Sequence, residues 1–522
     1  CINTSLIRII NKHQKICEKV FEPELLTKVL ENKMKNLGMP FVIVTSNVPN
    51  EIVKALEART FSLHIKGSAG TGKTTLALEL MRMLSEKCSA IYLSTRVSRD
   101  MLYEQFPWSK TCIPPENILD IKSGGYPRTK ARTRTRSSRE ALFEYVDKES
   151  FLKNLFFMAS DARGEHFSIV VDSLEALKSS LRIPEDDISV EQDILRIADK
   201  FDANVIFVSE TSGESKLDYL VDGVVRLEKE TLKERLLRKM YIEKIRGTKI
   251  ENPMYLFTLK DGRFTYLEKG LFVKKVTVES PKVEEKEGKI STLIPELDKI
   301  LDGGYDKGSF NIFDVNKNVG RLHAYVLSSM FFKFIRQGFP MFYLPSKGVT
   351  SSDLVGHVPS TFLDKDFLNS LKRYFYVFKP KEFDSQARTV SYNQFFFEGE
   401  DYIKDLNIFK EIVVKVLGEV QTDSFVIVMA SDIIEYIYGS RNILKIIQTW
   451  MNEVKRLNGV MIVVQFEQEF FELPNYMAAS HFRLENIGGN FVFYGEIPRT
   501  KIYVTTLEVS DKYVQIRFIP IE

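Results

Sequence analysis

The 522-residue chain is predicted to be an α/β protein with two tandem domains, each a mostly parallel sheet flanked by helices. Three observations predict this class. Residues 61–66 read as a strand that runs into a glycine-rich turn and a helix, and further apolar strands alternate with helical segments. The second half of the chain then repeats the pattern of the first. Strands that alternate with helices are typical of parallel sheets.

Composition agrees with a globular chain of several domains. The hydrophobic content is 44% and the charged content 27%, and the length corresponds to two to four domains at about 150 residues each. A net charge of +3 gives no global attraction to nucleic acid or membrane. The cysteines, which lack C-x-x-C spacing, predict a reducing, cytoplasmic location without a zinc site; they are Cys1, Cys17, Cys88 and Cys112. No apolar run is long enough to span a membrane, so we expect no membrane association.

Residues 67–74 match the phosphate-loop pattern G-x-x-x-x-G-K-[ST] in full. The glycines let backbone amides approach phosphate oxygens, and the helix that follows, expected from Thr74 to about Glu86, adds the positive end of its dipole. Lys73 is predicted to contact the β- and γ-phosphates, and the Thr74 hydroxyl to bind magnesium. The predicted nucleotide-binding residues here are Gly67, Ser68, Ala69, Gly70, Thr71, Gly72, Lys73, Thr74 and Thr75.

Two later strands end in polar residues. Residues 167–172 form an apolar strand that ends in Asp172, which we expect to run beside the loop strand and to hold magnesium through water. Residues 204–210 form a second buried strand, and its tip offers Ser209 and Glu210 as sensors of the γ-phosphate.

Two basic segments have open interpretations. Lys244 and Arg246 share one face of a predicted strand, where they either guard an exposed edge or reach a phosphate. Between Arg128 and Arg139, six cations occur in twelve residues, separated by Thr and Ser. This loop is either a solvated insertion or an anion-binding segment for nucleic acid, a partner protein or the nucleotide of a neighbouring subunit.

The second half repeats the first at offsets of 248 to 258 residues. In the repeat, Val315 takes the place of Gly67, Arg321 that of Lys73, and Ala430 that of Asp172. Leu322 takes the place of Thr74, which is predicted to bind magnesium in the first domain. Asp432, two residues after Ala430, is the nearest substitute acid. A leucine cannot bind magnesium, so we expect a nucleotide-free copy.

The predicted boundaries follow from these segments. We expect a helical N-terminal extension over residues 1–38, an ATPase-type domain over 39–271, a charged linker over 272–289 and the degenerate domain over 290–522. Within the first domain, residues 41–45 and 89–95 are expected to be strands, and residues 50–58 a helix.

The chain resembles the KaiC branch of the RecA-superfamily ATPases. Residues 290–309, from Ile-Ser-Thr-Leu-Ile-Pro-Glu-Leu-Asp to Gly-Ser, are similar to the opening segment I-S-T-G-I-P-x-L-D of that branch, and residues 244–248 to its K-x-R-G-T motif. The resemblance covers about residues 40–270 and 288–520. It implies two RecA-like domains and ATP with Mg²⁺ bound at the subunit boundaries of a homo-oligomeric ring, commonly a hexamer. Lys244 and Arg246 would act across the interface.

One departure from this family concerns hydrolysis. Two adjacent glutamates follow the second strand in the KaiC branch, one of which activates water, whereas this chain has Thr95-Arg96-Val97. We therefore expect a slow ATPase, or one that recruits another acid such as Glu210 as its catalytic base. The residues Ser94 to Ser98, the arginine-rich loop and the degenerate domain also resemble, more loosely, the archaeal gas-vesicle regulator GvpD.

The leading functional prediction is an ATP-binding regulatory or signalling ATPase, in which one intact site drives assembly or a change of shape. Two alternatives remain open from the sequence. One is a DNA-binding recombination or repair ATPase with the arginine-rich loop on the phosphate backbone. The other is a nucleotide-sensing scaffold with negligible hydrolysis.

Overall fold

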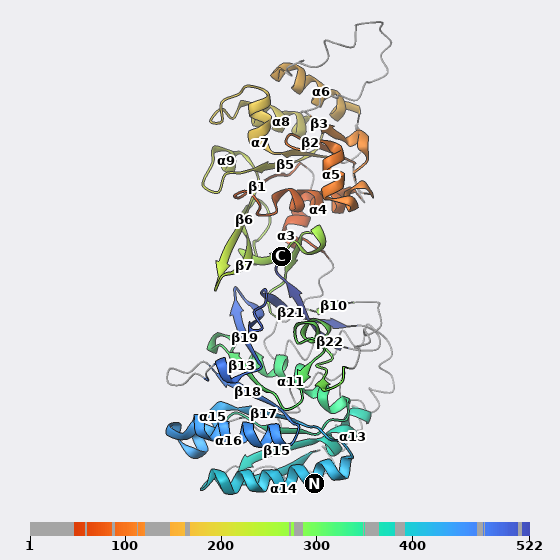
Figure 1. Ribbon diagram of the computed structural model, residues 1–522. Helices are drawn as coiled ribbons and strands as arrows, with labels where there is room; N and C mark the ends of the chain where they lie inside the picture. The colour runs from red at the N-terminus through yellow and green to blue at the C-terminus, as the bar shows by residue number, and fades with distance from the viewer. Residues whose placement is uncertain are drawn as a thin grey trace, which may run out of the picture. The chain divides into compact units, whose positions relative to one another are not determined.

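In the computed structural model the chain divides into two compact units, which are treated separately here. The N-terminal unit comprises Thr45–Leu267 with Ile521–Glu522, and the C-terminal unit includes Glu268–Pro520. Figure 1 shows strands with helices packed against them in each unit. The described residues are 46–57, 60–85, 89–111, 113–120, 147–161, 167–270, 273–275, 286–347, 349, 365–381, 392–466, 473, 475–509 and 514–522.

The N-terminal unit contains a nine-stranded sheet in the order β3-β2-β4-β5-β1-β6-β7-β8-β9. Its strands are β1 (Ser62–Lys66), β2 (Ser89–Ser94), β3 (Ile118–Asp120), β4 (Phe167–Asp172), β5 (Asn204–Ser209), β6 (Gly223–Leu232), β7 (Arg235–Ile245), β8 (Met254–Thr258) and β9 (Thr265–Leu267). Its helices are α3 (Asn50–Glu57), α4 (Lys73–Ser85), α5 (Arg99–Gln105), α6 (Lys148–Asp161), α7 (Leu174–Ser180), α8 (Ser189–Lys200) and α9 (Lys216–Leu220), with short 3-10 turns η1 (Pro107–Thr111), η2 (Pro115–Asn117) and η3 (Lys260–Gly262).

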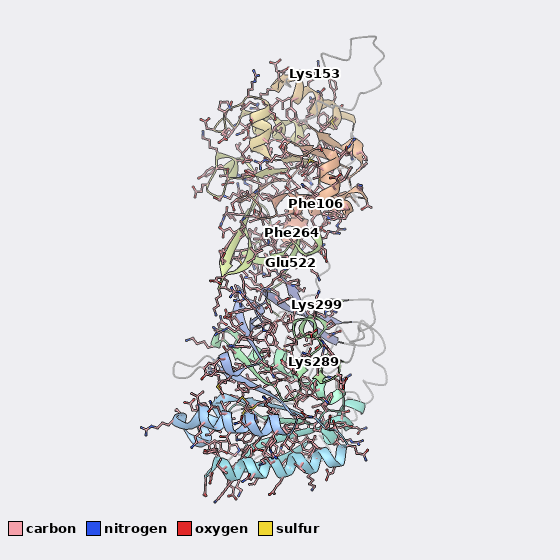
Figure 2. All side chains as sticks on the ribbon, in the orientation of Figure 1. Phe106, Lys153, Phe264, Lys289, Lys299 and Glu522 are labelled. Atoms are coloured by element: carbon pink, nitrogen blue, oxygen red, sulfur yellow. The ribbon has the colours of Figure 1, made fainter. Side chains whose placement is uncertain are left out.

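The six strands from β3 to β6 in the sheet order run parallel, and the central ones are buried, as their apolar sequences predict. β1 and β5 are buried along their whole length, and β4 is buried except at Asp172. From β6 onward the strands are antiparallel. Phe264, labelled in Figure 2, is fully buried and stacks on Phe257 with ring centroids 4.7 Å apart, so the antiparallel end has an aromatic core of its own.

One expectation about this sheet is wrong. We expected the strand that ends in Asp172 to run beside the loop strand, but β5 lies between β4 and β1. The register pairs Lys66 with Ser209 and Asp172 with Val208, so the acid lies two strand spacings from β1, about 10 Å. The site is therefore three strands wide, with the tip of β5 in its middle.

The C-terminal unit is built around an eleven-stranded sheet. The strands of the unit are β10 (Val273–Lys275), β11 (Lys289–Ile290), β12 (Tyr305–Asp306), β13 (Phe310–Val315), β14 (Met341–Leu344), β15 (Phe375–Pro380), β16 (Asn393–Phe397), β17 (Val426–Ala430), β18 (Val460–Phe466), β19 (Ser480–Ile487), β20 (Asn490–Ile497), β21 (Tyr503–Val509) and β22 (Val514–Pro520), of which β11 and β12 pair separately. Its helices are α10 (Pro295–Ile300), α11 (His323–Arg336), α13 (Lys365–Tyr374), α14 (Tyr402–Val420), α15 (Ser431–Tyr438) and α16 (Ile443–Arg456), with 3-10 turns η4 (Lys317–Leu322), η7 (Ser440–Asn442) and η8 (Asn475–Met477).

The strand order confirms that one fold is used twice. The run β19-β13-β18-β17-β14-β15 in the second sheet corresponds to β6-β1-β5-β4-β2-β3 in the first. In both units the strand before the loop has a later strand on each side and a helix directly after the loop. The fold is therefore two tandem RecA-like α/β units, as the sequence predicts.

Several predicted segments differ from the structure or fall outside its described part. Val273–Lys275, inside the segment expected to be a linker, form β10 and pair with β21. The predicted extension over residues 1–38, the strand over 41–45 and the arginine-rich loop between Arg128 and Arg139 lie outside the described residues.

Candidate functional site

The phosphate loop, residues 67–74, has a backbone that only glycine accommodates at its key positions. Gly67, Gly70 and Gly72 have φ angles of 151°, 75° and 101°. A Cβ on Gly67 would lie 2.3 Å from the Leu227 carbonyl oxygen, and one on Gly72 would lie 2.9 Å from Leu259 Cδ1. Because neither a left-handed backbone nor this space admits a side chain, the glycines are required by the fold of the loop.

Lys73 opens α4 and lies folded onto the loop. Its ammonium donates to the carbonyl oxygens of Gly67 at 2.7 Å and Ser68 at 2.9 Å, and the residue is 7% exposed. Burial lowers the pKa of Lys73, while Glu210 and Asp172 act in the opposite direction. The loop therefore holds a desolvated cation with no direct carboxylate partner within the described part of the chain, which favours an incoming anion.

Asp172 and Thr74 meet at the end of β4. The Thr74 hydroxyl hydrogen-bonds the Asp172 carboxylate, and the buried Tyr92 hydroxyl donates to Asp172 Oδ2 at 2.6 Å. Thr95 Oγ1 donates to the Asp172 carbonyl at 2.9 Å, which fixes the strand end. Burial raises the pKa of Asp172 despite these bonds. Hydroxyl and carboxylate oxygens are the donors that Mg²⁺ prefers, so this pair fits a magnesium ion held by few protein ligands.

No group of three or more His, Cys, Asp or Glu side chains in the described residues could hold a metal ion by itself. A magnesium ion in a phosphate-loop site takes only one or two protein ligands and completes its shell with water and phosphate oxygens. Thr74 and Asp172 therefore stay the predicted magnesium-binding residues.

A salt bridge crosses the site between the ends of β2 and β5. The Arg96 guanidinium pairs with the Glu210 carboxylate, and this pairing lowers the pKa of Glu210. The backbone N–H of Glu210 donates to Glu175 Oε1 at 2.7 Å. Sequence analysis missed Glu175, although it follows Asp172 by one turn in Asp-Ser-Leu-Glu and its position at the start of α7 was a usable signal.

The second predicted sensor, Ser209, joins a buried polar cluster behind the loop. His64 Nε2 lies 2.6 Å from Ser209 Oγ, and His64 Nδ1 lies 2.7 Å from Asp218 Oδ1. Lys66, which directly precedes the loop, donates to Asp218 Oδ2 at 2.9 Å. The tip of β5 and the base of the loop are thus tied to the same carboxylate on α9.

Lys244 lies in β7 and Arg246 just beyond its end, and both contact residues of α9 or of the segment that joins α9 to β6. Lys244 Nζ donates to the carbonyl oxygens of Asp218 at 2.7 Å and Val221 at 2.5 Å. Arg246 Nη1 lies 3.1 Å from Asp222 Oδ1. These contacts are made within one chain and away from the phosphate loop residues.

The corresponding loop of the C-terminal unit, residues 315–322 (the degenerate loop), is closed by internal hydrogen bonds. The Asn316 N–H donates to Leu484 O at 2.9 Å, the Val319 N–H to Asn316 O at 3.0 Å, and the Asn318 N–H to Asn316 Oδ1 at 3.0 Å. Gly320 alone among the described residues of this loop has a positive φ, 59°. The turn is the 3-10 helix η4, and the amides of Asn316, Asn318 and Val319 are used in these bonds.

The nearest acid in this copy is also engaged. Asp432 lies in the first turn of α15, where its carboxylate accepts from the Ser346 hydroxyl and from the Lys347 N–H. Ala430 occupies the strand end that Asp172 occupies in the first unit. The described residues therefore bring no acid to the magnesium position of the second copy.

The fold and this site define a P-loop nucleotide-binding domain of the RecA-like class in the N-terminal unit, accompanied by a second unit of the same fold. Comparison with known proteins specifies the class further. Residues 57–243 match the family model described as "GvpD gas vesicle protein, P-loop domain". The resemblance to GvpD is therefore confirmed. The KaiC-like features, which are ATP bound at subunit boundaries and a homo-oligomeric ring, stay predictions.

Two curated relatives come from Halobacterium salinarum. Protein GvpD1 is 28% identical over 272 residues, which cover 50% of this chain and 48% of that protein. Protein GvpD2 is 29% identical over 270 residues, which cover 50% of this chain and 53% of that protein. The match thus spans about half the length of these relatives. None of the described helices is both long and apolar enough to cross a membrane.

Proposed function

We propose that the chain is a regulatory ATPase that binds ATP with Mg²⁺ in its N-terminal unit and no nucleotide in its C-terminal unit. The observation that carries this proposal is the contrast between the two loops. The first loop has three left-handed glycines and a desolvated lysine, and the second uses its amides for its own hydrogen bonds.

Within the proposed site, each residue has a role that follows from its position. The amides of residues 68–75 bind phosphate oxygens, and Lys73 exchanges its carbonyl contacts for the β- and γ-phosphates. Thr74 binds magnesium directly and Asp172 binds it through water, while Tyr92 orients the Asp172 carboxylate. Bound magnesium would neutralise charge that develops on the phosphates.

We further propose that hydrolysis is slow. The position after β2 that carries a glutamate pair in the KaiC branch is occupied by Arg96 and Val97, so this position offers a cation instead of a carboxylate. A slow reaction suits a regulator, because the bound nucleotide then defines a state of long lifetime.

The regulatory assignment extends the resemblance of the sequence to the gas-vesicle regulator GvpD. The matching family is described as a gas vesicle protein family, and we propose that the present chain also acts in gas-vesicle formation. The proposal covers the shared P-loop domain, since the match spans about half of each curated relative.

Assembly is proposed from the basic motif. Lys244 and Arg246 lie at and just beyond the end of β7, and Tyr219 beside them is 74% exposed. We propose that ATP promotes a homo-oligomeric ring in which this surface faces the nucleotide of the next subunit. Mass photometry with and without Mg-ATP tests this proposal: an Arg246→Ala variant that assembles like the parent protein would contradict it.

The experiment that tests ATP binding uses matched substitutions in the two units. Lys73→Ala is expected to weaken binding of a fluorescent ATP analogue by about 100-fold or more, because it removes the buried cation of the site. Arg321→Ala, at the corresponding position of the degenerate loop, is expected to leave the affinity unchanged. Equal affinity in Lys73→Ala and parent protein, or loss of binding in Arg321→Ala, would contradict the assignment of the site.

A further inference from the structure

The predicted candidate for the catalytic base, Glu210, is already engaged by a cation. Its carboxylate pairs with Arg96 across the carboxyl ends of β5 and β2, and this pairing makes Glu210 a weaker proton acceptor. Arg96 itself stands where the KaiC branch has its glutamate pair. The site therefore needs another acid if ATP is to be hydrolysed.

Glu175 has a buried carboxylate oxygen without a partner in the described part of the chain, whereas the carboxylate of Glu210 is paired with Arg96. It lies in the first turn of α7, three residues after Asp172, and its Oε1 accepts the Glu210 N–H at 2.7 Å. Its Oε2 is buried and has no hydrogen-bond partner within the described part of the chain. A buried carboxylate oxygen without a donor is costly for the fold, which favours a role that a bound molecule completes.

The carboxylate of Glu175 also belongs to the electrostatic surroundings of the phosphate loop. It contributes, with Glu210 and Asp172, to the field at the Lys73 ammonium, and it acts on Arg96 as well. In the degenerate copy, the residue three positions after Ala430 is Ile433, which is 3% exposed. The unit without an open phosphate loop thus has an apolar side chain where the N-terminal unit has this acid.

We propose that Glu175 is the general base of ATP hydrolysis in the N-terminal unit. This inference rests on the proposed function and adds the residue that activates water. The Glu210 N–H fixes one carboxylate oxygen of Glu175, so the other oxygen is left to accept a hydrogen bond from the attacking water.

The reaction balances without a further reactant. The water oxygen forms a bond to the γ-phosphorus while the bond from that phosphorus to the β,γ-bridging oxygen breaks, and the electron pair of that bond leaves with ADP. Glu175 Oε2 accepts the proton that the water loses and passes it to the inorganic phosphate product. Arg96 and Lys73 supply positive charge at the same edge of the sheet.

The test compares three glutamine variants in single-turnover hydrolysis of radiolabelled ATP, with affinity for a fluorescent ATP analogue measured in parallel. Glu175→Gln keeps an oxygen that accepts the Glu210 N–H but cannot take a proton. We expect its hydrolysis rate to fall at least 100-fold while its ATP affinity stays within about threefold of the parent. Glu210→Gln is expected to slow the reaction less than tenfold. Glu214→Gln, an exposed acid on the loop that follows β5, is the matched control and should behave as the parent.

The outcomes separate this inference from the proposed function. If Glu175→Gln hydrolyses ATP at the parent rate, or if Glu210→Gln loses more activity than Glu175→Gln, Glu175 is not the base. If the parent binds ATP without hydrolysing it, the inference is overturned although the binding site stands. If the parent does not bind ATP, the proposed function itself fails.

Discussion

The phosphate loop and the degenerate loop occupy the same place in two copies of one fold, yet their backbones use their amides in opposite ways. In the phosphate loop, left-handed glycines hold the chain open beside β6. In the degenerate loop, the N–H groups of Asn316, Asn318 and Val319 bond within the loop or to β19. The difference teaches that an open phosphate loop is maintained by residues that forbid its closure. Once these residues change, backbone N–H groups of the loop form hydrogen bonds with the loop itself or with the neighbouring strand.

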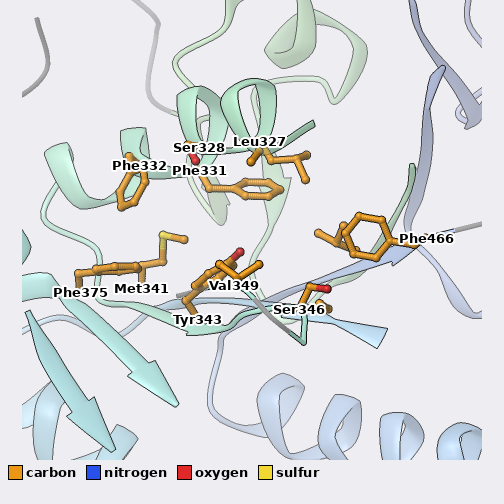
Figure 3. A pocket seen from close by; sticks show the side chains of 13 residues that line it. Leu327, Ser328, Phe331, Phe332, Met341, Tyr343, Ser346, Val349, Phe375 and Phe466 are labelled. Atoms are coloured by element: carbon orange, nitrogen blue, oxygen red, sulfur yellow. The ribbon is translucent and has the colours of Figure 1, made fainter. Parts of the chain in front are cut away.

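The strand ends beside the two loops also differ, since the first unit has an acid there and the second has an alanine. Tyr92 in the first unit donates to Asp172. By sheet register, Tyr343 takes the place of Tyr92 in the second unit, next to Ala430 instead of an acid. A mainly apolar cavity of about 60 Å³ lies beside these residues, between α11 and the sheet (Figure 3). Its lining residues are Ala324, Leu327, Ser328, Phe331, Phe332, Met341, Tyr343, Ser346, Val349, Phe375, Ala430, Val464 and Phe466.

The largest effect is expected when the phosphate loop receives the residue of the degenerate loop. Gly67→Val places a branched side chain on a backbone with φ of 151°, where even a Cβ would lie 2.3 Å from the Leu227 carbonyl oxygen. We expect ATP affinity, measured by titration with a fluorescent analogue, to fall at least 100-fold, because the loop must close or shift away from β6.

The reverse substitution is the control for this comparison. Val315 is 1% exposed, so Val315→Gly removes a buried side chain and is expected to destabilise the C-terminal unit by roughly 2 kcal/mol or more. It should create no second ATP site, since the amides of the degenerate loop remain bonded. A variant of Gly67→Val with parent affinity, or two bound nucleotides in Val315→Gly, would break the comparison.

Much of this architecture was predictable because its signals are local. The phosphate loop, the β4 strand and the α4 helix follow from glycine spacing and apolar runs, and the repeat of the fold follows from matching segments in the two halves. Val315 and Ala430 predict that the second copy binds no nucleotide, which stays a prediction. The closed hydrogen bonds of the degenerate loop explain how that copy accommodates the changes.

What the sequence could not supply was the arrangement across strands. Nothing local to β4 indicates that β5 separates it from β1, because strand order depends on crossover connections and on packing. For the same reason the pairing of Arg96 with Glu210, which joins residues 114 positions apart, was not predicted. The acid at the start of α7 was visible in the sequence, but its contact with the Glu210 N–H was not, because that contact depends on the arrangement of the strands.

A smaller effect is expected at the strand end, where Tyr92→Phe removes the donor to Asp172 Oδ2. Hydrogen bonds to charged groups contribute about 1.5–3 kcal/mol, and this one also opposes the rise in the pKa of Asp172 that burial causes. We expect ATP affinity to weaken about tenfold with Mg²⁺ present and to change little in EDTA. Tyr343→Phe, at the corresponding position of the second unit, should have no effect on ATP binding. An equal loss of ATP affinity with and without Mg²⁺ would show that Tyr92 does not act through the magnesium site.

The smallest effect concerns a second lysine that burial desolvates. Lys333 on α11 is 6% exposed, and its ammonium donates to the Leu293 carbonyl oxygen at 2.8 Å, as Lys73 donates to loop carbonyls in the first unit. Burial lowers the pKa of Lys333 to about 7, against Asp298 and Glu296, which favour the charged form. In the phosphate loop a triphosphate would compensate such a cation, whereas we propose that the degenerate copy binds no phosphate.

The pH dependence of stability follows from this shift. Between pH 7 and about 10.5 the unfolded chain binds more protons at this lysine than the folded chain, so the contribution of Lys333 to stability rises with pH through that window and is constant below it.

Lys333→Met removes the buried charge, and Leu293 O keeps the Gln515 side chain as a donor at 3.0 Å. We expect the melting temperature at pH 7 to rise by about 2–6 °C and the increase in stability from pH 7 to 10 to shrink. Thermal melts at both pH values, with the exposed Lys404→Met as control, measure the difference. If Lys333→Met retains the pH slope of the parent protein, Lys333 is already compensated, and the contrast drawn here between the two buried lysines is lost.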